Sequence, residues 1–480
     1  MKDVAKKEVQ RIPRKADDLS EWYTQVCLQA QLADYAPVRG CIVMRPYGYA
    51  IWELISAEFD RRFKATGHQN AYFPLLIPES LLVREAEHVE GFAPEVAWVT
   101  EGGGEKLTER LAIRPTSEAI IGVMYAKWIQ SHRDLPVLIN QWANVMRWEK
   151  ATRPFLRTLE FLWQEGHTAH ASREEAAAEV QQMLEIYRAV AEGVLALPVI
   201  IGRKSENEKF AGALATFAIE ALMPDGKALQ AGTSHELGQN FAQAYDIKFT
   251  DVDEQVKFVW TTSWGVSWRV LGGVIMVHGD DNGLVLPPSI APHQVVIVPI
   301  PRKGAEDVMP AARELAAELR SVARVHLDDR AEQSAPWKFN EWELRGVPLR
   351  IELGKRDLDA NAVTVARRDT LTKESVPRAD IASRITTLLS TMQDAMLAKA
   401  RADLDARTTS VGDKASLIAA LKEQKGFVIA PWCEDASCEL EIKAQSGAVT
   451  RVIIGPAQAG EACAYCGKPA RVRAYFARSY

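Results

Sequence analysis

The sequence predicts an α+β domain built on an antiparallel sheet, followed by an α/β domain and a small α+β domain at the C-terminal end. The first domain shows short apolar runs between turn residues, such as LPVLIN, ATFAIEALM, VKFVWTTSW and GGVIMVHGD, without regular alternation with helices. At LPPSIAPHQ, residues 286–294, three prolines mark a linker, and a regular alternation of strands and helices begins. Four of the six cysteines lie at or after position 433. We therefore place the domains at residues 1–286, 287–400 and 401–480.

The composition restricts the class of protein. Hydrophobic residues make up 47% and charged residues 25% of the 480 residues, as in water-soluble globular proteins. The sequence has no stretch of about 18 apolar residues, so we expect no membrane partner. The basic N-terminal segment MKDVAKKEVQRIPRK is not followed by an apolar run, which argues against a secretory signal and favours the cytoplasm. With a net charge of -5, a nucleic acid would have to meet a local basic patch.

Two amphipathic helices and one interrupted strand are predicted in the first domain. The first helix spans residues 46–67 and ends at Gly67, and its apolar face is formed by Ile51, Leu54, Ile55, Phe59 and Phe63. The segment NAYFPLLIP reads as a strand interrupted by Pro74, which is typical of the margin of a sheet or of an interface. The second helix begins with a capping box of Ser172 and Glu175, and its apolar face is formed by Val180, Met183, Leu184, Tyr187 and Val194.

The stretch RWEKATRPFLRTLEFLWQEGH, residues 147–167, concentrates charged and aromatic side chains. It predicts two strands joined by an ATRP turn, with Arg147 and Glu149 on one face of the first strand. The same face of the second strand would carry Arg157, Leu159, Phe161, Trp163 and Glu165. Guanidinium groups suit a polyphosphate, aromatic rings suit a base, and carboxylates suit an amine. The alternative is a salt-bridged hairpin on the surface.

Three further segments have polar residues that ordinary structure also explains. Arg269 precedes the glycine-rich run of SWGVSWRVLGGVIMVHGDDNGLVLPP, which could be a buried hairpin. In RPTSEA, residues 114–119, a threonine and a glutamate precede a helix, as in an N-cap. In QAGTSHELGQN, residues 230–240, His235 could be a structural histidine.

Together these segments resemble prolyl-tRNA synthetases, a family of class II aminoacyl-tRNA synthetases. TGHQNAYFPLLIP is similar to motif 1; RWE, FLRT and FLWQEGHTAH are similar to motif 2; SWG, Arg269 and HGDDNGLVLPP are similar to motif 3. The prolyl-specific signatures RPTSEA, EKFAGA and QAGTSHELGQNF are present. The gap between motifs 2 and 3 is too short for the large editing insertion of many bacterial enzymes. The resemblance therefore implies a class II synthetase-like catalytic domain of the archaeal/eukaryotic-like form, which carries an extra C-terminal zinc-binding domain.

The resemblance implies a reaction in two steps, in which ATP and L-proline form prolyl-adenylate and the prolyl group then passes to tRNA(Pro). Arg147, Arg157 and Arg269 would be the catalytic residues, because positioning and charge can carry this chemistry without a nucleophilic side chain. The implied ATP-binding residues are Arg147, Glu149, Arg157, Thr158, Phe161, Gln230, Thr233, Ser267 and Arg269. The implied proline-binding residues are Thr116, Glu118, Arg147, Trp163, Glu165, His167, Phe210 and His235. Mg²⁺ would be bound mainly by the phosphates.

The cysteine pattern indicates a metal site in the last domain. Cys433 and Cys438 form C-x4-C, and Cys463 and Cys466 form C-x2-C. Four thiolates at such spacing suit a closed, structural zinc site, whereas the alternative is four reduced, buried thiols. The resemblance supports zinc and places the C-terminal residue, Tyr480, near the active site.

Two further partners follow from the resemblance. Residues 337–357 are similar to the family's anticodon-reading segment, where Glu343, Lys355 and Arg356 suit the two guanines of a proline anticodon. Each of these three could equally be an ordinary solvated charge. Motif 1 implies a homodimer, with Pro74 at the interface between subunits.

Two residues depart from the family's pattern. Leu159 stands where a polar or basic residue is usual, and Trp268 where a small hydroxyl residue is usual. We expect Trp268 to narrow the pocket or to alter inhibitor binding.

Two functions other than prolyl-tRNA synthesis stay open. The chain could be a paralogue that activates proline for drug resistance or for an acceptor other than tRNA, or a noncatalytic RNA-binding protein. The three arginines argue against the last.

Overall fold

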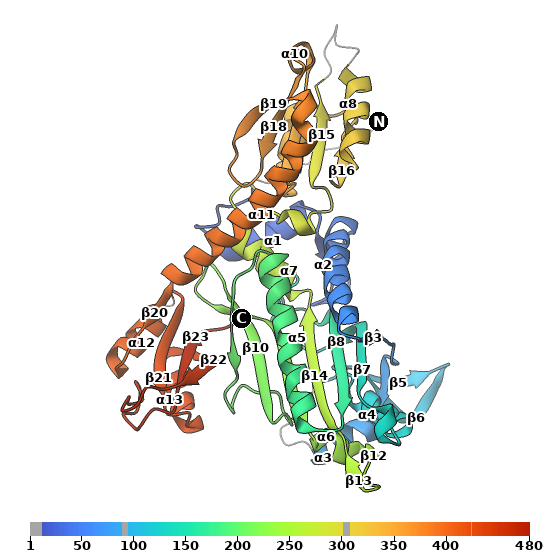
Figure 1. Ribbon diagram of the computed structural model, residues 1–480, viewed down its shortest axis with the longest axis vertical. Helices are drawn as coiled ribbons and strands as arrows, with labels where there is room; N and C mark the ends of the chain where they lie inside the picture. Colours follow the sequence, from blue (N-terminus) through green and yellow to red (C-terminus); the bar gives the residue numbers. More distant parts are fainter. Residues whose placement is uncertain (1–11, 89–94, 301–307, 424) are drawn as a thin grey trace. The chain divides into compact units, whose positions relative to one another are not determined.

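The computed structural model describes residues 12–88, 95–300, 308–423 and 425–480 (Figure 1). The described residues form two compact units. The first unit comprises residues 12–34, 43–54 and 274–396, and the second unit comprises residues 35–42, 55–273 and 397–480. In the described residues, no helix is both long and apolar enough to cross a bilayer.

The second unit is built on an eleven-stranded, mostly antiparallel sheet. In spatial order its strands are β20 (Thr408–Ser410), β21 (Phe427–Trp432), β23 (Val472–Ala477), β22 (Val449–Pro456), β9 (Val199–Arg203), β10 (Ala215–Leu222), β11 (Ala228–Gly238), β14 (Trp260–Ser267), β8 (Glu160–His170), β7 (Val137–Met146) and β3 (Gln69–Asn70). The central strands β10, β11, β14, β8 and β7 pair antiparallel in turn. The predicted antiparallel sheet is thus confirmed.

Helix α5 (Arg173–Gly193) packs along the strands β10, β11 and β14 (Figure 1). The Ser172 side chain accepts a hydrogen bond from the backbone N–H of Glu175, as the predicted cap requires. Helix α2 (Pro46–Ala65) is followed by Gly67 at φ 91°, which favours glycine. Phe59 and Phe63 from α2 pack with Tyr187 and Trp264, so the two predicted apolar faces meet in one aromatic core.

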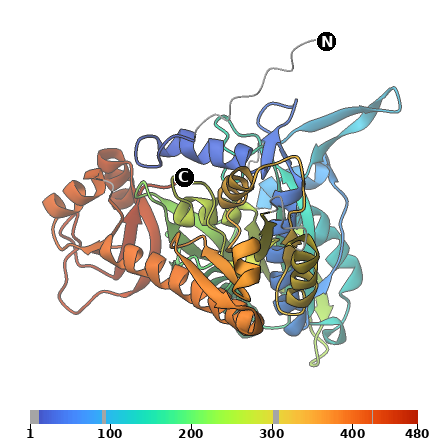
Figure 2. The same cartoon turned by 90° about the horizontal axis from the view of Figure 1, so that it is seen from above.

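Smaller elements complete this unit. They are the sheet β4 (Leu76–Pro78), β6 (Glu105–Ile113) and β5 (Trp98–Gly102), the hairpin β12 (Lys248–Thr250) and β13 (Val256–Phe258), and the helices α3 (Glu79–His88), α4 (Glu118–Trp128), η1 (His132–Asp134) and α6 (Asn240–Tyr245). Figure 2 shows β5 and β6 as a projecting hairpin. The strand predicted over residues 70–78 is wrong, because residues 71–75 are irregular and β3 and β4 belong to different sheets. Instead of a strand neighbour, the Phe73 N–H donates to the Gln141 side chain.

Two other local predictions differ from the structure. Strand β7 ends at Met146 and β8 begins at Glu160, so residues 147–159 form a loop and not two strand ends. Pro154 has no N–H, and Phe155 has φ 58°, which interrupts an extended ladder. Residues 272–278 of the run GGVIMVHGD lie in helix α7 (Arg269–His278), not in a strand or a buried hairpin. A short apolar run does not distinguish these alternatives.

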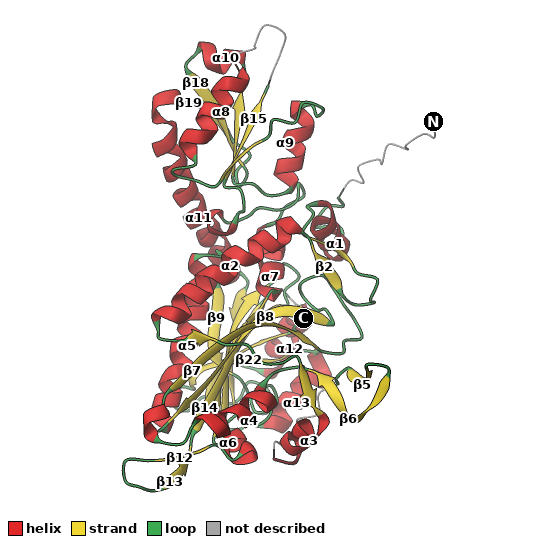
Figure 3. Cartoon of the chain, turned by 90° about the vertical axis from the view of Figure 1, so that its right-hand side faces the viewer, coloured by secondary structure: helices red, strands yellow, loops and turns green. Residues whose placement is uncertain are grey.

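The first unit contains a five-stranded sheet that has a core on each face. Its order is β16 (Val325–Leu327), β15 (Val295–Pro299), β17 (Leu349–Leu353), β18 (Ala362–Arg367) and β19 (Lys373–Pro377), with the first three strands parallel. Helices α8 (Val308–Leu319) and α11 (Ile381–Ala406) cover one face, and α9 (Ala335–Leu344) covers the other (Figure 3). The unit also has α1 (Leu19–Gln29), α10 (Lys355–Asp359), η2 (Pro288–Ile290) and η3 (Arg378–Asp380), and the short strands β1 (Ala33–Tyr35) and β2 (Ile42–Met44) pair with each other.

The C-terminal residues of the second unit have their own core. Helices α12 (Lys414–Glu423) and α13 (Ala436–Ser446) pack on β21, β22 and β23, and their buried residues surround Cys438 and Cys463. Strand β22 pairs with β9 at Ile453 and Arg203, so the last strands extend the central sheet.

Candidate active site

A cavity of about 580 Å³ opens in the second unit. Its walls come from β8, β11 and β14, from the start of α4 and from the loop of residues 204–214. Every residue predicted to bind proline lines this cavity: Thr116, Glu118, Arg147, Trp163, Glu165, His167, Phe210 and His235. Of the other residues predicted to bind ATP, those that line it are Phe161, Gln230, Thr233, Ser267 and Arg269.

Carboxylates and hydroxyls gather at one end of the cavity. Successive odd positions of β8 point inward, which brings Glu165 and His167 onto the cavity wall. Ser117 is the N-cap of α4, but its hydroxyl donates to Glu165 and makes no cap hydrogen bond, so the plain N-cap explanation of RPTSEA is insufficient. The Thr116 hydroxyl donates to Glu118, and Gln141 Nε2 donates to Glu165 Oε1 at 2.8 Å.

Glu165 and His167 form a buried ion pair, with 3.1 Å between His167 Nε2 and Glu165 Oε2. Burial alone would lower the pKa of His167, but the hydrogen bond to Glu165 and the charges of Glu118 and Glu165 outweigh it and raise that pKa. Burial alone would raise the pKa of Glu165, but His167, Ser117 and Gln141 outweigh it and lower that pKa. This end therefore keeps carboxylate charge at neutral pH.

His235 contributes an uncharged ring to the same end. Burial, and then the nearby charges of His167 and Arg147, lower its pKa to about 3. Its Nδ1 lies 2.9 Å from the Thr216 hydroxyl, and its ring centre lies 4.8 Å from that of Phe210. Among the described residues, the buried Trp163 Nε1 and the Ser263 hydroxyl have no hydrogen-bond partner. Both residues line the cavity and can serve a ligand.

Two guanidinium groups also line the cavity, those of Arg147, which is exposed, and Arg269, which is half-buried. Arg147 Nε donates to the Pro115 carbonyl at 3.0 Å, and its guanidinium lies over the rings of Phe161 and Trp163 at 5.4 and 5.3 Å. Arg269 Nε donates to the Leu156 carbonyl at 3.0 Å. Burial and then the charge of Arg147 lower the pKa of Arg269 to about 10, so it remains charged at neutral pH.

Three predicted ATP-binding residues do not line the cavity. Arg157 Nε lies 2.8 Å from Glu149 Oε2, and about half of the Arg157 side chain is exposed. Thr158 is buried, and its hydroxyl has no hydrogen-bond partner among the described residues. All three lie in or at the end of the loop where the strand prediction failed.

The residues that depart from the family's pattern are accommodated beside the cavity. Leu159 is buried, and its side chain leaves no room for a Cβ atom at Gly40, whose φ is 83°. Trp268 does not narrow the cavity as expected: it is buried in an edge contact with Phe155, 5.7 Å between ring centres, and is not among the residues that line the cavity. The Tyr480 ring lies beside Arg153 and Lys227, and its hydroxyl donates to Asp225, also outside the lining.

Several lining residues were not singled out from the sequence, among them Glu95, Trp148, Glu208, Lys209 and Ser263. Trp148 and Ser263 stand within the RWE and SWG segments, and Glu208 and Lys209 begin the EKFAGA signature. These four residues are polar or aromatic positions within segments that already resemble the family's motifs, and this is the signal that could have identified them. Glu95 has no such signal.

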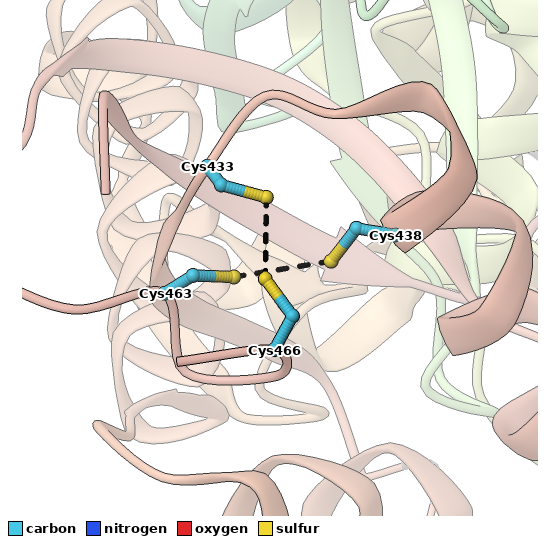
Figure 4. A group of neighbouring side chains, drawn as sticks. All are labelled: Cys433, Cys438, Cys463 and Cys466. Carbon is cyan, nitrogen blue, oxygen red and sulfur yellow. Dashed lines mark hydrogen bonds between the residues drawn. The ribbon is translucent and has the colours of Figure 1, made fainter. Parts of the chain in front are cut away.

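The four C-terminal cysteines form one cluster (Figure 4). Their sulfur atoms all lie within 4.8 Å of one another, with 3.5 Å between those of Cys433 and Cys466 and 3.8 Å between those of Cys438 and Cys463. Four thiolates bound tetrahedrally to zinc at about 2.3 Å would lie about 3.8 Å apart. The cluster therefore fits a closed zinc site.

The structure separates the three predicted anticodon residues. Glu343, in α9, lines a small pocket of the first unit together with Arg350, Arg367, Arg368 and Lys373. Lys355 and Arg356 lie in α10, beyond the far end of β17, and do not line that pocket.

Comparisons with known proteins agree with this geometry. The antiparallel core that carries the arginines is that of a class II aminoacyl-tRNA synthetase, since residues 98–278 match the model "tRNA synthetase class II core domain (G, H, P, S and T)". Residues 294–388 match "Anticodon binding domain", and residues 416–480 match "Prolyl-tRNA synthetase, C-terminal".

Full-length relatives define the family. The chain is 54% identical to the proline--tRNA ligase of Natranaerobius thermophilus, over 98% of both chains, and 52% identical to proline--tRNA ligase 2 of Clostridioides difficile, over 99% of both. The crystal structure of prolyl-tRNA synthetase from Cryptosporidium parvum, complexed with halofuginone and AMPPNP, superposes with a TM-score of 0.94 at 43% identity and covers 98% of this chain and 99% of that one. The chain belongs to the prolyl-tRNA synthetase family.

Proposed function

We propose that the cavity of the second unit is the place where this chain, a proline--tRNA ligase, joins proline to ATP and then passes the prolyl group to tRNA(Pro). One observation carries this assignment. The cavity has buried carboxylates and an uncharged ring at one end, and it is also lined by the guanidinium groups of Arg147 and Arg269. Such a site suits a ligand that bears a cationic amine and a polyphosphate.

The carboxylate end would bind proline. Its secondary ammonium would donate to Thr116, Glu118 and the Glu165 carboxylate that His167 holds in place, and its ring would pack among Trp163, Phe210 and His235. A charged His235 would repel the ammonium, and the pKa of about 3 avoids this at neutral pH.

The guanidinium groups would bind ATP. Arg147 would contact both the α-phosphate and the proline carboxylate, and so stabilise the charge that develops during displacement. Arg269 and Phe161 would enclose the adenine, while Gln230, Thr233 and Ser267 would contact the ribose end. Glu149, Arg157 and Thr158 complete the proposed set, and Arg157 would have to leave Glu149 when it reaches an outer phosphate. Mg²⁺ would be bound mainly by the phosphates themselves.

Outside the cavity, we assign a structural Zn²⁺ to the four cysteines Cys433, Cys438, Cys463 and Cys466. In the first unit, Glu343 would read an anticodon base together with the basic residues of its pocket. Lys355 and Arg356 would contact another part of the tRNA. The proposed domains are residues 1–286, 287–400 and 401–480.

A cytoplasmic homodimer is proposed through the motif 1 segment around Pro74. Tyr72 is 71% exposed and Leu76 is 37% exposed, so two large apolar side chains beside Pro74 are available for a second subunit. Sedimentation at micromolar concentration should show a dimer, and a monomer there would contradict this proposal.

Proline-dependent pyrophosphate exchange, followed by charging of tRNA(Pro), tests the site. Glu118→Gln should raise the KM for proline about tenfold or more, because the ammonium loses a charged partner. Arg269→Gln should raise the KM for ATP, whereas Glu174→Gln, an exposed carboxylate on α5, should change neither. Absence of exchange in the unaltered chain would refute the proposal. Exchange without charging would indicate the proline-activating paralogue instead.

A further inference from the structure

One wall of the cavity is an irregular loop, residues 204–214, that joins β9 to β10. Glu208, Lys209 and Phe210 of this loop line the cavity, and Phe210 contacts the ring of His235. Within the loop, the N–H groups of Glu208 and Lys209 both donate to the Ser205 carbonyl, at 3.1 and 2.9 Å. The position of Ser205 therefore sets the position of the residues that face the ligand.

The loop is attached to α13 through one buried carboxylate, Glu439. The Ser205 hydroxyl donates to Glu439 Oε1 at 3.0 Å, and Asn207 Nδ2 donates to Glu439 Oε2 at 3.0 Å. The backbone N–H of Thr450 donates to Oε1 at 2.9 Å, which fixes the carboxylate against β22. Glu439 is 1% exposed, so water cannot replace these donors without a rearrangement.

Neighbouring contacts attach the same loop to the same C-terminal residues. Arg203, at the end of β9, pairs with Glu434, and Asn207 Nδ2 also donates to the Ala436 carbonyl at 3.1 Å. Arg451 of β22 reaches Glu208 at 3.7 Å. Glu434 and Glu439 directly follow Cys433 and Cys438 in the sequence. Both of these carboxylates, which bond to the loop or to the end of β9, are therefore next to a residue of the cysteine cluster.

We propose that Glu439 is a positioning residue for proline binding, which acts through Ser205 and Asn207 to hold Glu208, Lys209 and Phe210 against the cavity. The inference rests on the proposed assignment of the carboxylate end of the cavity to proline. If the loop populates the binding-competent position only part of the time, the apparent affinity for proline falls by that fraction. The residues proposed to contact ATP lie on β11, β14, α7, the start of β8 and the loop of residues 147–159, none of which is part of the loop 204–214, so ATP binding is affected less.

The primary test compares Glu439→Gln with Glu441→Gln, an exposed carboxylate two residues further along α13. In Glu439→Gln the new amide cannot accept from both Ser205 and Asn207, so one donor loses its partner. The KM for proline in pyrophosphate exchange should rise about tenfold, while the KM for ATP should stay within about twofold, as expected for one lost charge-assisted hydrogen bond at one end of the site. Glu441→Gln should change neither constant.

A rescue experiment separates positioning from general damage. In Asn207→Asp a second carboxylate faces Glu439, so this single variant should also raise the KM for proline. In the double variant Asn207→Asp, Glu439→Gln, the amide of residue 439 can donate to the carboxylate of residue 207. The double variant should recover most of the lost affinity, although the Ala436 carbonyl loses its donor.

Hydrogen exchange gives a readout that is independent of activity. The amides of Glu208, Lys209 and Phe210 should exchange faster in Glu439→Gln than in Glu441→Gln, while those of the flanking strands β9 and β10 keep their protection. Equal exchange and an unchanged KM for proline in Glu439→Gln would overturn the inference. Phe210→Ala distinguishes a wrong role for Glu439 from a wrong assignment of the proline site. A raised KM for proline in Phe210→Ala supports the proline site, whereas an unchanged KM refutes both the site assignment and the role of Glu439.

Discussion

Glu220, Lys204 and Arg451 form a buried charge cluster in the second unit. Glu220→Gln should destabilise the unit more than removal of either of the other two charges. Glu220, on β10, is fully buried and accepts from Lys204 Nζ at 2.8 Å and from Arg451 Nη2 at 2.7 Å. Both cations are themselves buried, at 2% and 3% exposure. Removing the carboxylate charge leaves two buried cations without their shared counter-ion.

The magnitude follows from the charge balance of the cluster. Breaking a buried pair by removing one partner costs about 3–5 kcal/mol. Lys204 can relieve part of this by losing its proton, since burial already lowers its pKa. We therefore expect a loss of about 3 kcal/mol for Glu220→Gln. Lys204→Met should cost less, because Arg451 and Glu220 remain as a balanced pair joined by two hydrogen bonds.

Urea unfolding at pH 7, with thermal melting as a second readout, measures both variants. For a unit of this size, about 3 kcal/mol corresponds to roughly 5–10 °C in Tm. Lys204 and Arg451 outweigh the effect of burial and lower the pKa of Glu220 below its ordinary value of 4.5. The stabilisation that the Glu220 carboxylate provides is therefore complete above pH 4.5, and it is lost as the pH falls through the lowered pKa. A Lys204→Met variant as unstable as Glu220→Gln would refute this reasoning.

Three further predictions concern other parts of the second unit. Trp268→Ser should leave the KM values for ATP and proline within about twofold, because the ring does not line the cavity, while the Tm falls from the lost packing on Phe155. The neutral, half-buried His235 has a pKa of about 3, below its ordinary 6.5, so the unfolded chain gains a proton first as the pH falls. His235 should therefore contribute a loss of stability of about 2 kcal/mol between pH 6.5 and 5 in urea unfolding, and the loss over this range should be smaller by that amount in His235→Gln. Chelation of zinc should lower the Tm and release about one zinc ion per chain in a colorimetric assay, whereas the Cys466→Ser variant should bind zinc more weakly from the start.

Strong periodicity made part of the site predictable. The alternation of Phe161, Trp163, Glu165 and His167 is a period of two along one strand, and these side chains do share the cavity wall. The cap of α5 at Ser172 is an equally local signal, which the structure confirms. The cysteine spacing predicted a cluster that the fold then brings together.

The remaining features depend on contacts that no local pattern contains. Phe155 has a left-handed backbone within the loop of residues 147–159, where two strand ends were predicted, and a phenylalanine gives no local signal for this conformation. Lys204 bonds to residues that are 16 and 247 positions away in sequence. Glu343 and Lys355 are close in sequence but lie at opposite ends of a strand, because β17 runs between them.

The pairing of β22 with β9 has a consequence for shortened versions of this chain. Without residues 401–480, β9 would lose its pairing with β22 at Arg203, and Ile200, which is buried against Leu404, Phe427 and Val452, would lose that cover. An unpaired apolar strand of this kind recruits other chains through the same hydrogen bonds. A chain truncated before residue 401 should therefore aggregate instead of giving a smaller soluble enzyme. On this reasoning, residues 401–480 also protect the central sheet from pairing with other chains.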